Sequence, residues 1–352
     1  MAFETAAQLW RDRTAASREY SVVRNDRVSR AFLSRSPLPE SEYRAALAYR
    51  ASLIRQYADR TLEEVFPGRH VGTPEGEVYC ITRGHALRVP RWDRESFRRS
   101  LLSDLSLVRG IGKRTGEILR ARGYRTIPDL LHHRRFSAPA RECLRVLEEG
   151  TTGEVISLVA RWYPSSHVRH LSSARLLDPA DFLFLDIETL GIFQRPIILA
   201  GLARVEGSRL VTDQYLVCSM EEELPALLAA RGALQGYRAL VTYNGRSFDV
   251  PYLRERCALY GEAFSPCPIH YDLLHPVRRL FSERYPDCRL ATLERGLLGI
   301  TRWEDIPSMM VPEFYEAYVT HSNPGPLVPV VEHNCQDLVS LAMLFFSLLE
   351  AP

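Results

Sequence analysis

The sequence predicts a mainly α-helical N-terminal region followed by a mixed α/β domain. A chain of 352 residues, at about 150 residues per domain, favours two or three domains. Near residue 180 the hydropathy pattern changes from helical spacing to alternating strands and helices. The charge changes there as well. Residues 1–178 carry a net charge of +10 and residues 179–352 carry −8, although the whole chain is close to neutral at +2.

The composition is that of an ordinary folded protein. Hydrophobic residues make up 46% of the chain and charged residues 25%, which excludes disordered, collagen-like and coiled-coil proteins. No apolar run approaches the roughly 18 residues of a membrane span, so we expect no membrane insertion and a cytoplasmic protein. The seven cysteines form no CxxC pair, which argues against a disulfide framework and a zinc cluster.

Residues 1–95 are expected to be mainly helical, with a small strand pair. Residues 41–65 place apolar side chains three or four positions apart, which predicts a helix that Pro67 and Gly68 stop. Residues 76–87 have short β-prone runs broken by glycine, which predict the strand pair. The sequence leaves open whether this region contacts nucleic acid, docks a partner or only packs.

A glycine hairpin in residues 96–150 predicts a site for phosphate. The sequence GIGKRTGEIL places Gly110 and Gly112 directly before Lys113 and Arg114 at the start of a predicted helix. Glycines let the backbone approach a phosphate closely, and the free N–H groups of a helix N-terminus favour an anion. With the following GYRTIPDLL, the segment resembles a helix-hairpin-helix that binds DNA or RNA, although such a hairpin can also be purely structural or bind protein.

Residues 151–179 are expected to form a connector, and residues 180–352 a mixed sheet flanked by helices. Apolar and β-branched runs predict strands, and longer periodic segments predict helices between and after them. The expected strands cover residues 182–187, 196–205, 209–217 and 238–244, and a long apolar helix covers residues 326–350.

Acidic residues gather at the ends of the elements predicted for this domain. Asp186 and Glu188 stand two apart at the end of the first strand, so both side chains point to one face of the sheet. Asp249 follows the fourth strand at a helix start, and Asp337 lies one turn after His333 on the last helix. Carboxylates in an apolar setting raise the free energy unless a cation or donors compensate, which suggests a metal site. The alternative for Asp186 and Glu188 is a turn that carries solvated acids.

Three motifs carry a specific resemblance. The segments DIETLG (186–191), YNGRSFDVPYL (243–253) and HNCQDLVSL (333–341) resemble the exonuclease motifs of the DnaQ-like (DEDD) 3′-5′ exonucleases of the RNase H-like superfamily. The segments HYDLLHPVRRLF, RLATLERGLLGI and EDIPSMMVPEFY are most similar to the YprB-like branch. The resemblance implies an RNase H-like mixed sheet of five strands flanked by helices.

The resemblance also implies an activity and its cofactors. It implies a hydrolase that removes nucleotides from the 3′ end of DNA or RNA with two divalent cations, Mg²⁺ or Mn²⁺. Asp186 would bridge both ions, Glu188 and Asp337 would hold the ion on the nucleophile side, and Asp249 would help hold the other. These ligands are oxygen atoms, as hard cations prefer.

The family motifs imply roles for three further residues. His333 would be the general base, and Thr189 and Asn244 would contact the terminal sugar and phosphate. Relatives carry a His five residues before the last Asp or a Tyr four before it, whereas this chain has His333 four before Asp337. The alternative for His333 is a core or capping histidine.

Two other functions remain open at the level of sequence. A structure-specific endonuclease or resolvase could use the same fold, since hairpin modules often accompany enzymes that act on branched DNA. A non-catalytic adaptor that binds nucleic acid is the second alternative. The presence of all four carboxylates favours an enzyme.

Overall fold

The computed structural model describes residues 39–191, 195–302 and 306–350. The helical expectation for residues 1–38 lies outside these ranges. The strands are β1 (Arg69–Thr73), β2 (Gly76–Ala86), β3 (Phe182–Thr189), β4 (Ile197–Glu206), β5 (Arg209–Leu216), β6 (Ala239–Thr242) and β7 (Ile269–Asp272). The helices are α4 (Glu40–Gln56), α5 (Leu62–Val65), α6 (Arg94–Leu101), α7 (Lys113–Ala121), α8 (Ser137–Glu149), α9 (Thr152–Trp162), α10 (Val168–Ser172), α11 (Glu223–Ala233), α12 (Asp249–Leu259), α13 (Leu274–Phe281), α14 (Leu290–Leu293), α15 (Val311–His321) and α16 (Leu327–Glu350).

Within the described residues, seven strands belong to one mixed sheet in the order β1-β2-β5-β4-β3-β6-β7. Strands β3, β6 and β7 run parallel to one another, and the remaining neighbours are antiparallel. The mixed α/β class is therefore confirmed, but the expected count of five strands is wrong. Five strands do come from residues 180–352, and β2 joins them by pairing with β5 from Tyr79↔Leu216 to Ala86↔Arg209.

The predicted strand pair also differs in its bounds. Residues 76–86 form one continuous strand, and its partner in the hairpin is β1 at residues 69–73. Gly84 remains within the strand, opposite Val211 of β5, so this glycine does not end it. Local sequence indicates that residues 76–86 form a β-strand, but it does not indicate the pairing with β5. That strand is more than a hundred residues away along the chain.

Alternation along β3 separates the two faces of the sheet. Phe182 and Phe184 face α16, where the ring of Phe345 lies 4.8 Å and 5.8 Å from their ring centres. Leu183, Leu185 and Ile187 point the other way, into a core shared with α11 and α12. Since strand side chains alternate, Asp186 and Glu188 continue the face that carries the two phenylalanines. The packing of α16 thus decides what covers the two carboxylates.

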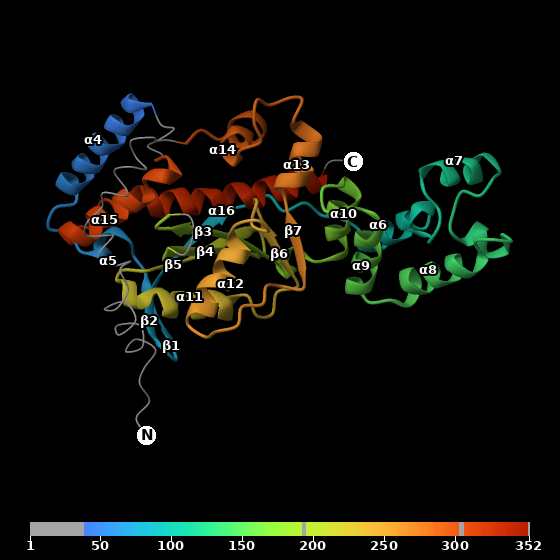
Figure 1. The fold of residues 1–352 in the computed structure, drawn as a ribbon, viewed down its shortest axis with the longest axis horizontal. Helices are drawn as coiled ribbons and strands as arrows, with labels where there is room; N and C mark the ends of the chain where they lie inside the picture. Colours follow the sequence, from blue (N-terminus) through green and yellow to red (C-terminus); the bar gives the residue numbers. More distant parts are fainter. Residues whose placement is uncertain (1–38, 192–194, 303–305, 351–352) are drawn as a thin grey trace, which may run out of the picture.

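Helices α6 to α10 form a lobe beyond the end of the sheet, next to the C-terminal end of α16 (Figure 1). Its buried apolar side chains are continuous with the core beneath α16, and Trp92 stacks on Phe346 at 6.2 Å. The boundaries at residues 95, 150 and 180 stay predictions. Across the described ranges, no helix combines the length and apolar character that crossing a membrane requires.

Candidate functional site

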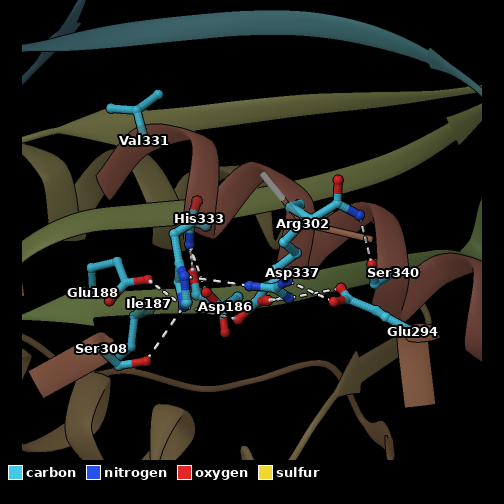
Figure 2. Close-up of polar contacts among 12 residues, drawn as sticks. Asp186, Ile187, Glu188, Glu294, Arg302, Ser308, Val331, His333, Asp337 and Ser340 are labelled. Atoms are coloured by element: carbon cyan, nitrogen blue, oxygen red, sulfur yellow. Dashed lines mark hydrogen bonds and ion pairs between the residues drawn. The ribbon is translucent and has the colours of Figure 1, made fainter. Parts of the chain in front are cut away.

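Helix α16 crosses β3 so that an aromatic contact and a polar contact lie along the same strand face. About three turns before Phe345, the side-chain amide of Asn334 donates to Asp186 Oδ2 at 2.7 Å and to the Asp186 carbonyl at 3.1 Å. One residue earlier, His333 Nε2 lies 3.9 Å from Glu188 Oε1 and 3.6 Å from Asp337 Oδ2 (Figure 2). The structure therefore brings Asp186, Glu188, His333 and Asp337 together.

Asn334, which the sequence analysis did not single out, is fixed by β4 and β5. It is fully buried, and its Oδ1 accepts a hydrogen bond of 2.9 Å from the Gln214 side chain. Gly201 lies opposite Asp186 in the sheet, and a Cβ at this glycine would stand 2.1 Å from Asn334 Oδ1. Gly201 is thus required for Asn334 to reach Asp186.

Asp249 approaches β3 from the other face of the sheet, as the first residue of α12. It is 5% exposed, and its Oδ1 accepts a hydrogen bond of 3.2 Å from the Ile187 backbone N–H. Burial raises the pKa of Asp249 to about 7, against the opposing effect of the backbone N–H groups that bind the carboxylate. The Asp337 charge contributes to the same shift.

The turn before Asp249 is held by a buried carboxylate on β7. Asn244 has φ of 67°, in the left-handed region, and its N–H donates to Asp272 Oδ1 at 2.8 Å. Asp272 Oδ2 accepts from the Arg246 N–H at 2.9 Å. Thr189 has a similar local contact, because its Oγ1 donates to the Gly191 carbonyl at 2.7 Å. Thr189 and Asn244 therefore shape turns that follow β3 and β6, and their contacts with a nucleotide stay predictions.

The four carboxylates interact through their charges. Burial raises the pKa of Asp186 well above its usual range, and the charges of Asp337, Glu188 and Asp249 raise it further in that order. Each of three carboxylates already has a donor: Asn334 for Asp186, Ile187 N–H for Asp249 and a guanidinium for Asp337.

Cations would relieve the repulsion among these carboxylates. Their oxygen atoms are the ligands that Mg²⁺ and Mn²⁺ prefer, so the chemistry of the donor set fits such ions. In the described part of the chain, no three acidic, histidine or cysteine side chains already converge as a metal-binding group.

Arg302 is the principal side chain that the sequence analysis missed. Its Nε and Nη2 donate to the two carboxylate oxygens of Glu294 at 2.6 Å and 2.7 Å. Nη2 also donates to Asp337 Oδ1, and Nη1 lies 3.3 Å from His333 Nδ1 (Figure 2). Burial alone would lower the pKa of Arg302, but the hydrogen bonds and charges of Glu294 and Asp337 raise it. No local sequence pattern marks this arginine, because its two partners on α16 lie 31 and 35 residues away along the chain.

The hairpin residues lie apart from this site, in the lobe that carries α7 and α8 (Figure 1). Gly110 has φ of 89°, which favours glycine, and Gly112 is the N-cap of α7. Both glycines, Lys113 and Arg114 are exposed. On α7, Leu119 is buried, whereas Ile118 is 46% exposed and does not belong to the core. On a short helix only one face packs inward, so adjacent residues such as these two differ in burial.

The segment that forms this site is similar to known proteins. Residues 183–349, from the first strand of the site to its last helix, match the model of the RNase H superfamily. This segment, a little under half of the chain, is thus similar to RNase H-like domains. The uncharacterized protein YprB of Bacillus subtilis (strain 168) is 32% identical over 197 residues, which are 54% of this chain and 47% of that protein. The alignment thus covers about half of this distant homologue.

The crowding of carboxylates predicts an unusual response to losing one. In chelator at pH 8, Asp186→Asn should raise the free energy of unfolding, because burial and the neighbouring carboxylates disfavour the charged form of Asp186. The folded protein binds protons more readily at Asp186 than the unfolded chain does. Wild-type stability should therefore increase as the pH falls from 8 toward the usual pKa of an aspartate, and that of the variant should increase less.

Urea denaturation in EDTA measures both effects. Glu148→Gln, which neutralises an exposed carboxylate on α8, is the control and should leave the stability unchanged. A lower stability of Asp186→Asn in chelator would contradict the electrostatic account.

Proposed function

We propose that the protein is a metal-dependent nuclease, specifically a DnaQ-like (DEDD) 3′-5′ exonuclease that hydrolyses phosphodiester bonds of DNA or RNA. One observation carries the proposal. Within an RNase H-like domain, β3, α12 and α16 bring four carboxylates into mutual electrostatic contact, and all four belong to the motifs that resemble this exonuclease family.

Each carboxylate has a proposed role in holding two cations, Mg²⁺ or Mn²⁺. Asp186 would contact both ions, Glu188 and Asp337 would hold the ion on the nucleophile side, and Asp249 would help hold the other. When bound, such ions promote deprotonation of the attacking water and neutralise charge on the leaving oxygen. His333 lies beside Glu188 and Asp337, so it contacts the water side of the site. Thr189 and Asn244 contact the terminal nucleotide.

The helix-hairpin-helix segment is proposed to bind the nucleic-acid backbone. Lys113 and Arg114 stand at the N-terminus of α7, where positive side chains and the positive end of the helix dipole repel each other. A phosphate on the exposed hairpin would relieve this repulsion and accept hydrogen bonds from backbone N–H groups of the first turn of α7, such as those of Lys113 and Arg114. Such contacts carry little sequence information, so we expect binding to depend strongly on salt.

A nuclease assay tests the proposed activity. With Mg²⁺ or Mn²⁺, 5′-labelled single- and double-stranded DNA and RNA should shorten one nucleotide at a time. Asp186→Asn should lower the rate at least about 100-fold, because metal-ion catalysis supplies several kcal/mol of stabilisation. Glu206→Gln neutralises an exposed carboxylate at the end of β4 and should keep full activity.

The products also separate the alternatives. One internal fragment instead of a ladder would favour a structure-specific endonuclease or resolvase. Salt-sensitive binding without cutting of any substrate would favour the adaptor.

Charge reversal tests the hairpin separately from the chemistry. Lys113→Glu with Arg114→Glu should weaken binding to a DNA or RNA duplex about 10-fold or more at moderate salt and reduce the salt dependence of the affinity. Fluorescence anisotropy over a salt series measures both quantities. Arg44→Glu with Arg55→Glu makes the same charge change on α4, at the opposite end of the molecule, and should have a much smaller effect (Figure 1). Equal loss in both double variants would contradict a hairpin site.

A further inference from the structure

We propose that Arg302 is a positioning residue that fixes the tautomer of His333 and the orientation of Asp337. In this arrangement His333 presents an N–H group, not a lone pair, to Glu188 and Asp337. The tautomer itself follows from contacts within the protein. Its consequence for catalysis rests on the proposed nuclease function.

Arg302 is held rigidly by a buried carboxylate. Its guanidinium is bound by both oxygens of Glu294, which is fully buried in the π-helical turn Glu294–Leu298. Two parallel hydrogen bonds from a planar guanidinium fix its plane as well as its position. The Arg302 side chain is itself only 10% exposed. The edge that faces α16 therefore has a defined direction.

The two ring nitrogens of His333 have different partners. A guanidinium can only donate hydrogen bonds, so Nδ1 of His333, 3.3 Å from Arg302 Nη1, must be the acceptor in that contact. A neutral imidazole has one protonated nitrogen, and the proton is then on Nε2. Nε2 faces two carboxylate oxygens, Asp337 Oδ2 at 3.6 Å and Glu188 Oε1 at 3.9 Å, and the Ser308 hydroxyl, which is able to accept, at 3.4 Å. The contacts of Nδ1 and those of Nε2 therefore favour the same tautomer.

Arg302 also holds Asp337, by one of its two carboxylate oxygens. Arg302 Nη2 donates to Asp337 Oδ1, while Oδ2 faces the His333 ring. One guanidinium thus sets the direction of a carboxylate and of an imidazole on the same face of α16. The unusual spacing of four residues between His333 and Asp337 allows this, because side chains four apart lie over one another on a helix.

This geometry changes the role expected for His333. A general base needs a free lone pair on the nitrogen that faces the water. While Arg302 binds Nδ1, the nitrogen that faces the carboxylates carries a proton and acts as a donor. His333 would then orient a water or a phosphate oxygen by donating to it, in contrast to the general-base role that the family motifs imply.

Nitrogen NMR of the full-length protein tests the tautomer without any substrate. In protein labelled with ¹⁵N-histidine at pH 8, where an ordinary imidazole is neutral, long-range ¹H–¹⁵N spectra distinguish the two nitrogens. Loss of one spin system in His333→Gln assigns the signals. We expect a protonated Nε2 in the wild type and a shift toward a mixture of tautomers in Arg302→Lys, because an ammonium cannot bind Glu294 with two parallel bonds and still reach both partners on α16. Glu294→Gln, which weakens the same anchor, is the second variant.

Arg256→Lys is the matched control. Arg256 makes an equivalent buried two-bond contact with Glu223, at 2.7 Å and 2.6 Å, on the other face of the sheet. The control should lose stability and leave the His333 signals unchanged. A protonated Nδ1 in the wild type, or an unchanged tautomer in folded Arg302→Lys and Glu294→Gln, would overturn the proposal.

Kinetics test the catalytic consequence. Arg302→Lys should lower kcat about 10-fold or more with little change in KM, as loss of a residue that orients metal ligands does. If the wild-type protein shows no nuclease activity, the proposed function fails, while the NMR result still decides the role of Arg302.

Discussion

The antiparallel crossing of α16 over β3 is the contact on which the site depends. At one end the contact is a close-packed aromatic core, in which Phe345 lies over Phe182 and Phe184. At the other end the same strand face carries Asp186 and Glu188, and the same helix carries His333 and Asp337. Because aromatic packing tolerates little displacement, it fixes the distance at which the polar side chains meet.

Repulsion among the four carboxylates destabilises this arrangement, and hydrogen-bond donors, both neutral and positively charged, offset part of it. Asn334, the Ile187 N–H and Arg302 each bind a different carboxylate. Only Arg302 among these donors carries a charge, and it contacts one end of the cluster. The remaining repulsion keeps the pKa of Asp186 high and leaves an electrostatic role for bound cations. The net charge of −8 in residues 179–352 includes these carboxylates. Residues 1–178, with a net charge of +10, contain the exposed hairpin with Lys113 and Arg114.

Sequence patterns predicted what depends on local periodicity. The two-residue spacing of Asp186 and Glu188 and the four-residue spacing of His333 and Asp337 each place a pair on one face of a regular element, as the structure shows. The edge pairing of β2, the approach of Asn334 to Gly201 and the contact of Arg302 with α16 were not predicted. Each depends on partners brought together only by the tertiary fold, so no spacing along the chain encodes it.

The most direct test of the central claim is a titration with Mn²⁺ followed by electron paramagnetic resonance, which counts free and bound ions without requiring a substrate. If the cluster on β3, α12 and α16 exists to hold cations, the wild-type protein should bind two ions saturably and Asp186→Asn should lose binding at both sites, because Asp186 is the ligand that they share. Absence of saturable binding in the wild type, or unchanged binding in Asp186→Asn, would contradict the account.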